Sequence, residues 1–261
     1  METSLNGKNA LVCGGSKGIG KAIAIELAKL GASITLAARS AEVMSELLAE
    51  LPDSPGQNHD FLVVNMNNTE DLIRKTHNLT LTKTIHILIN NSGGPPGGPI
   101  LDASEEEFVS ALTRHLIANH HLVRLLSPGM KENGYGRIIN IISTSVKEPI
   151  PGLGVSNTTR GAVASWAKTV AMELGPFGIT VNNILPGFTR TERLTSLFTQ
   201  WAAEQQISLK EFEEKMAKTV PLGRIADPQE VAAVTAFLAS PAASYVSGVS
   251  LPVDGGRTRG I

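Results

Sequence analysis

Apolar and polar residues alternate along this chain in two rhythms, which predict short strands separated by longer helices. Runs that are apolar on both faces are typical of strands covered by helices on both sides of a parallel sheet. Seven such runs are present, at residues 9–13, 33–38, 60–65, 85–90, 137–143, 179–185 and 249–253. Their spacing leaves room for helices between them, which indicates right-handed β-α-β crossovers.

Helix signals fall in the gaps between these runs. A stripe of apolar residues at helical spacing follows the first run and ends at a glycine, a common helix stop: Ile19, Ile23, Leu27, Leu30 and Gly31. Capping-box patterns at residues 104–107 and 227–230 predict two more helices, the first running to about residue 130. Residues 193–218 are polar with a helical pattern.

We therefore predict an α/β fold, in which a three-layer, Rossmann-like domain over residues 1–261 contains a doubly wound parallel sheet of about seven strands. Residues 190–220 are expected to form a helical segment that covers the substrate.

Composition narrows the function classes. The 261 residues are 42% apolar and 18% charged, with a formal net charge of −1. Near neutrality argues against a nucleic-acid binder, and no run approaches the roughly 20 apolar residues of a membrane span. A single cysteine, Cys13, and no secretory signal pattern favour a cytoplasmic location.

The first motif with chemical meaning is a glycine-rich loop directly after the first predicted strand: Gly14, Gly15, Ser16, Lys17, Gly18, Ile19 and Gly20. Glycines let the backbone approach a pyrophosphate, and the start of the following helix attracts negative charge. This strand, loop and helix context predicts a dinucleotide site. The alternative is a purely structural tight turn.

Arg39 and Ser40 follow the second predicted strand, where NAD-binding folds place an acid for the ribose 2′-hydroxyl. An arginine there, with Lys17 nearby, favours the 2′-phosphate of NADP(H), and NAD(H) is the alternative cofactor. A solvent-exposed charge without a ligand is the other interpretation of Arg39.

These and later motifs resemble the short-chain dehydrogenase/reductase family and are close to those of its bacterial 3-oxoacyl-acyl-carrier-protein reductases. The glycine loop is similar to the family's TGxxxGxG pattern, with Cys13 in place of threonine. The resemblance implies these further cofactor contacts: Asn65, Met66, Asn91, Ser92, Gly93, Arg160, Pro186, Gly187, Thr189 and Thr191. Ser92 stands where the family's NNAG motif has alanine.

The catalytic pattern departs from the family's. The resemblance implies a tetrad of asparagine, serine, tyrosine and lysine, and places His115, Ser143, Ser156 and Arg160 at those positions. Only the serine is kept. Serine lacks the acidity of tyrosine, and arginine does not readily exchange a proton.

We interpret His115, acting directly or through a water held by Ser156, as a replacement acid. The alternatives are a histidine that packs or meets solvent, and a pair, Ser156 and Arg160, left over in a protein that only binds. No metal site is expected, because His115, His120 and His121 are spaced five and six residues apart and do not share a helix face.

The leading functional hypothesis is NADP(H)-dependent carbonyl reduction or alcohol oxidation, with a 3-oxoacyl thioester or small ketone as the substrate that the resemblance implies. The resemblance also implies a homotetramer or dimer, without nucleic-acid or membrane partners. The alternatives are a cofactor-binding redox sensor and a structural partner of an active homologue.

Overall fold

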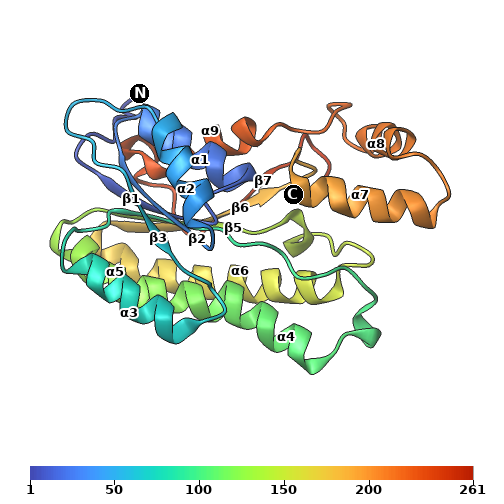
Figure 1. Ribbon diagram of the computed structural model, residues 1–261, viewed down its shortest axis with the longest axis horizontal. Helices are drawn as coiled ribbons and strands as arrows, with labels where there is room; N and C mark the ends of the chain where they lie inside the picture. Colours follow the sequence, from blue (N-terminus) through green and yellow to red (C-terminus); the bar gives the residue numbers. More distant parts are fainter. Residues whose placement is uncertain (261) are drawn as a thin grey trace.

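The computed structural model describes residues 1–260, which form a seven-stranded sheet between two layers of helices (Figure 1). The strand order is β3-β2-β1-β4-β5-β6-β7, and every neighbouring pair is parallel. The strands are β1 (Asn9–Cys13), β2 (Ser33–Ala38), β3 (Asp60–Val63), β4 (Ile87–Asn90), β5 (Gly136–Ile141), β6 (Ile179–Pro186) and β7 (Ser250–Val253). The predicted doubly wound fold is confirmed, and the chain reverses its winding direction between β1 and β4, where such sheets bind ligands.

The helices divide between the two faces of the sheet. They are α1 (Gly18–Lys29), α2 (Ala41–Glu50), α3 (Thr69–Thr80), α4 (Glu105–Leu112), α5 (Ala118–Glu132), α6 (Gly154–Leu174), α7 (Glu192–Glu204), α8 (Leu209–Ala217) and α9 (Pro228–Ala239). Figure 1 shows α1, α2 and α9 on one face and α3, α4, α5 and α6 on the other. Separate apolar clusters fill the two sides, with Leu27 and Leu36 in one and Leu88 and Leu126 in the other.

The long helix predicted from residue 104 is divided in two. Its start is as predicted, since Ser104 and Glu107 form a capping box. After α4, however, residues Thr113–Ile117 form a π-helical turn before α5 begins. Single π-helical turns inside α-helices occur often at functional sites, and this one carries the buried side chain of His115.

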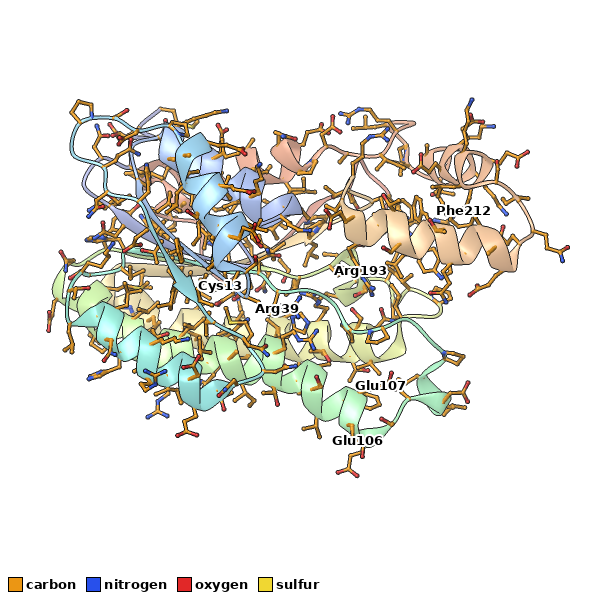
Figure 2. The ribbon with its side chains drawn as sticks, viewed as in Figure 1. Cys13, Arg39, Glu106, Glu107, Arg193 and Phe212 are labelled. Atoms are coloured by element: carbon orange, nitrogen blue, oxygen red, sulfur yellow. The ribbon has the colours of Figure 1, made fainter. Side chains whose placement is uncertain are left out.

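The polar helical segment predicted over residues 193–218 is also two helices, α7 and α8, separated at Gln206, which has a left-handed φ of 55°. Its inner face is more apolar than the prediction assumed. Phe198 and Phe212 are both buried, and their ring centroids are 5.2 Å apart. Figure 2 shows Phe212 in α8, at the end of the molecule away from the main sheet. Packing within this cluster holds the two helices together.

A row of side-chain amides joins four strands inside the sheet. Asn90 donates to Asn140 at 2.8 Å, Asn140 donates to Asn183 at 2.9 Å, and Asn183 donates to Ser250 at 3.0 Å. Buried polar groups need such partners, and a paired ladder tolerates little slippage in register. The ladder therefore fixes the register of β4, β5, β6 and β7 relative to one another.

Among the described residues, no helix has the length and apolar character needed to cross a lipid bilayer.

Candidate functional site

The glycine loop between β1 and α1 is packed so closely that side chains would not fit. Gly18 has a φ of 53°, and a Cβ on Gly20 would overlap the carbonyl oxygen of Gly14 and lie 2.7 Å from Nδ2 of Asn91. The first turn of α1 contains no acidic residue, and Lys17 makes no capping hydrogen bond. The open N–H groups at this helix start are therefore suited to phosphate oxygens.

Residues from β4 and α7 close in on this loop. Asn91 Nδ2 donates to the carbonyl oxygen of Gly14 at 3.3 Å. Thr191 caps α7 by accepting from Leu194 N at 3.2 Å, and its Cγ2 lies 3.1 Å from where a Gly18 Cβ would be. The structure thus brings the predicted Gly14–Gly20 loop, Asn91 and Thr191 into one cradle.

The segment from Pro186 to Thr189 continues β6 at the same edge of the sheet. Thr189 is buried, and its hydroxyl donates to the carbonyl oxygen of Gly187 at 3.2 Å.

Cys13 ends β1 beneath the cradle, and burial raises the pKa of its thiol to about 12. Cys13 therefore packs as a small apolar residue rather than as a reactive thiol.

The predicted phosphate-binding residues after β2 lie at the surface. Arg39 is exposed, and Ser40 caps α2 by accepting from Val43 N at 3.4 Å. Asn65 is exposed and Met66 is partly buried. Lys17, expected to assist Arg39, instead pairs with Glu192 at 3.1 Å. Because this ion pair is exposed, it contributes little free energy and is readily exchanged for another anion.

His115 lies in a buried, positively charged environment. It is 3% exposed, and its Nδ1 is 2.6 Å from Oγ of Ser92. Its Nε2 has no hydrogen-bond partner in the part of the chain that the structure describes. Burial, followed by the charges of Arg160 and Arg114, lowers the pKa of His115 to about 2. The imidazole is neutral near pH 7, so the expected imidazolium acid is replaced by a neutral hydrogen-bonding group.

Arg160 is the second buried polar group of this corner. Its Nη1 donates to the carbonyl oxygen of Ile141 at 2.9 Å, whereas its Nε has no partner among the described residues. Burial and the charge of Arg193 lower the pKa of Arg160 to about 10, which leaves it cationic near neutral pH. The guanidinium of Arg160 therefore lies beside the end of β5, where Ile141 precedes Ser143 by two residues.

Ser143 and Ser156 are both partly buried. Ser143 Oγ accepts from Ser145 N at 3.1 Å. Ser156 lies on α6 one turn before Arg160, so the two share a helix face. Within residues 1–260, no hydrogen bond links either serine to His115.

Three contributions were not predicted from the sequence. Ser92 was assigned to the cofactor, but the structure also pairs it with His115. Arg114 donates to the carbonyl oxygen of Gly93 at 3.2 Å, and Arg193 donates to that of Pro95. The available signal was that Ser92 and His115 both depart from the pattern the chain resembles.

Comparisons with known proteins agree with this geometry. A family model described as enoyl-(acyl carrier protein) reductase matches residues 14–258. A tropinone reductase homologue of Arabidopsis thaliana is 32% identical over 99% of this chain and 96% of its own length. The NADPH-dependent reductase BacG of Bacillus subtilis is 30% identical over 97% of this chain and 99% of its own length.

The chain is also similar to a solved structure over its full length. L-Sorbose reductase from Gluconobacter frateurii, complexed with NADPH and L-sorbose, superimposes with a TM-score of 0.93. It shares 30% identity, and the match covers 100% of both chains. Similarity therefore extends over the whole fold, including the segment that holds α7 and α8.

Proposed function

Because this chain belongs to the short-chain dehydrogenase/reductase family, we propose that it is an NADP(H)-dependent oxidoreductase that reduces a small ketone. The observation that carries the proposal is a pair of buried nitrogens that have no partner among residues 1–260, Nε2 of His115 and Nε of Arg160. Buried polar groups that the protein leaves unpaired are costly, and a ligand oxygen would satisfy them. His115 is not among the cofactor contacts that the resemblance implies, so its unpaired nitrogen favours a substrate in addition to the dinucleotide.

The cradle supports NADP(H) as the cofactor. The N–H groups at the start of α1 suit its diphosphate, and Arg39 suits a 2′-phosphate, since Ala38, Arg39 and Ser40 offer no carboxylate to bind a free ribose hydroxyl. BacG is an NADPH-dependent reductase and the L-sorbose reductase structure is a complex with NADPH, and both relatives favour this choice over NAD(H). When bound, the cofactor supplies the hydride that reaches the carbonyl carbon.

The chain's own residues act on the carbonyl oxygen. Ser143 and Arg160 stabilise the negative charge that develops there, because hydrogen-bond donors fixed in a dry site are effective for this purpose. His115 contributes as a neutral imidazole, which donates from Nε2 while Nδ1 accepts from the Ser92 hydroxyl. Ser156, one helical turn from Arg160, is assigned to hold a water molecule beside them.

The proton that the alkoxide needs comes from His115 and Ser92. His115 Nε2 gives its proton to the alkoxide oxygen of the product, and Nδ1 takes the Ser92 hydroxyl proton. Ser92, which is only partly buried, recovers a proton from water. This route needs no imidazolium, in agreement with the pKa of about 2 for His115.

The direct test measures NADPH consumption with a panel of small ketones and 3-oxoacyl thioesters, beside a titration of NADPH binding. We expect binding and ketone-dependent turnover. The double variant Ser156→Tyr with Arg160→Lys restores the family's tetrad residues at two positions and serves as an internal reference. Tight NADPH binding without turnover by the natural chain, while the double variant reacts, would identify a redox sensor instead. Absence of binding would favour a structural partner.

We further propose that the chain forms a homodimer or homotetramer through its long helices. Val109 on α4 and Ile117 in the π-helical turn are 55% and 41% exposed, which supplies apolar surface for such contacts. Light scattering in solution tests this, and a monomer at micromolar concentration would contradict it.

A further inference from the structure

Two guanidinium groups meet beside Gly94. The position that a Cβ on Gly94 would take is 3.8 Å from Nη2 of Arg160 and 3.8 Å from Nη2 of Arg193. Arg160 comes from α6, Arg193 from the first turn of α7, and Gly94 from the loop after β4. Figure 2 shows Arg193 at the end of α7 nearest the sheet, far from Phe212. Three separate segments thus build one positively charged corner.

Neither arginine has a carboxylate partner within residues 1–260. Their hydrogen bonds go to neutral carbonyl oxygens, those of Ile141 for Arg160 and Pro95 for Arg193. The nearest acid in the sequence, Glu192, is paired with Lys17 at 3.1 Å. The corner therefore holds two adjacent positive charges that the described chain does not neutralise.

The burial of Arg160 makes this arrangement costly. It is 7% exposed, and its Nε has no partner within the described range 1–260. A buried charge is normally paired, since desolvation is only offset by an opposite charge or several hydrogen bonds. Arg193 adds repulsion, which together with burial lowers the pKa of Arg160. Two neighbouring guanidinium groups without a carboxylate partner are typical of a site that is completed by an anionic ligand.

We propose that Arg160 and Arg193 together bind a carboxylate of the substrate, so that the compound reduced is a small oxo acid. This rests on the proposed function and narrows its substrate class. Arginine matches a carboxylate because its planar fork donates two parallel hydrogen bonds. Free oxo acids thereby take precedence over the neutral thioesters that the family resemblance implied.

The position of the pair argues for the substrate rather than another anion. The proposed cofactor places its diphosphate on the α1 start and its 2′-phosphate at Arg39, so neither phosphate needs the pair. The cofactor contact that the resemblance implies for Arg160 is to the ribose, which carries no charge of its own. A phosphate on an acyl carrier arm would lie many bonds from the reacting carbonyl. Arg160, in contrast, is buried on α6, and its guanidinium donates to the carbonyl oxygen of Ile141, two residues before Ser143. The anion must therefore be small and attached near the ketone.

The first arm of the test measures binding without turnover. Acetoacetate and methyl acetoacetate, which differ mainly in the charged oxygen, are titrated by calorimetry into the protein saturated with NADP⁺, which has no hydride to give. We expect acetoacetate to bind at least tenfold more tightly than its ester. In Arg193→Gln this preference should fall at least tenfold, while NADPH affinity changes less than threefold.

The matched control is Arg190→Gln. Arg190 is an exposed arginine three residues earlier that pairs with Asp227 at 3.5 Å. Arg190→Gln removes the same unit of charge from the same segment, but Arg190 is not among the residues near Gly94. The preference for acetoacetate should persist in this variant. A preference lost equally in both variants would reflect general charge attraction and would overturn the assignment.

The second arm measures NADPH consumption with pyruvate, acetoacetate and levulinate, each against its methyl ester and acetoacetate also against its N-acetylcysteamine thioester. We expect kcat/KM at least tenfold higher for one of the acids. Turnover that favours esters or the thioester would overturn the oxo-acid assignment and leave the oxidoreductase proposal intact. Selective binding of acetoacetate without any turnover would overturn the oxidoreductase proposal and leave only the carboxylate-binding role of the pair. If Arg193→Gln instead weakens NADPH binding and leaves the acid-to-ester ratio unchanged, the pair serves the cofactor.

Discussion

The cofactor cradle and the catalytic corner lie side by side in this molecule, but they are built by different means. The cradle is made of backbone: Gly18 and Gly20 let chain segments approach one another, and the start of α1 offers its N–H groups. The corner is made of side chains, among them His115 and Arg160, which are buried and incompletely paired.

The difference teaches which kind of site persists when residues change. A backbone cradle tolerates few substitutions, so its pattern stays recognisable and its ligand class follows from it. A side-chain corner can be rebuilt by paired changes, as with Ser92 and His115, which bond to each other at 2.6 Å. The two regions therefore respond differently to mutation, and four variants test this.

Gly20→Ala should have the largest effect. Its Cβ would overlap the backbone carbonyl oxygen of Gly14, a neighbour that cannot move without displacing the loop. We expect NADPH affinity to fall at least 100-fold in a fluorescence titration. Gly161→Ala, on α6 with open space around it, is the control and should leave affinity within twofold. Near-normal binding in the Gly20 variant would show that the cradle is not built on close approach.

Arg160→Met tests the catalytic corner, where we expect activity to fall without a loss of stability. Removing a fixed donor from a developing oxyanion costs roughly 10²–10³-fold in kcat. Replacing a buried charge with an apolar side chain of similar length, however, is often neutral or stabilising. We expect kcat to fall by about this factor while the midpoint of thermal unfolding stays the same or rises. A marked fall in that midpoint would mean that Arg160 is structural.

Much of the fold could be predicted from the sequence, because its signals are local. Seven apolar runs became seven strands, and the Ser104 and Asp227 capping boxes both formed. The π-helical turn at Thr113–Ile117 could not be predicted, since its residues continue an ordinary helical pattern. The apolar interior around Phe198 was also missed, because its partner Phe212 comes from the next helix.

The candidate site also has a part that could be predicted from the sequence and a part that could not. The glycine loop and Asn91, both assigned to the cofactor from the sequence, lie in contact, since their places follow from strand order. The charge state of His115 could not be predicted, because it depends on burial and on Arg160 and Arg114, which the fold brings near it. Sequence alone also assigned Lys17 to the cofactor, without indicating its ion pair with Glu192.

His115→Asn sharpens the comparison through the dependence of stability on pH. The pKa of His115 is 6.5 when unperturbed and about 2 in the folded protein, so below pH 6.5 the unfolded chain binds a proton that the folded chain does not. Stability from this group is complete above pH 6.5 and is lost as the pH falls toward 2. At about 1.4 kcal/mol per pH unit, the loss between pH 6.5 and 5 is about 2 kcal/mol.

The measurement is the free energy of unfolding by urea at pH 7 and pH 5. His115→Asn should lose about 2 kcal/mol less than the natural chain over this interval. His120→Asn, which changes an exposed histidine on the adjoining helix, is the control and should follow the natural chain. Equal losses in all three proteins would show that His115 takes up a proton in the folded state.

Ser92→Ala should have the smallest effect, and it tests whether the two departures act together. The change restores the residue of the family's motif but removes the hydroxyl bonded to His115 Nδ1. A neutral hydrogen bond contributes about 0.5–1.5 kcal/mol, so we expect kcat to fall about 3–10-fold with little change in NADPH affinity. If Ser92 acts only through His115, Ser92→Ala should cost nothing further in the His115→Asn background. Additive losses would mean that the serine serves the cofactor directly, and that it belongs with the cradle rather than with the corner.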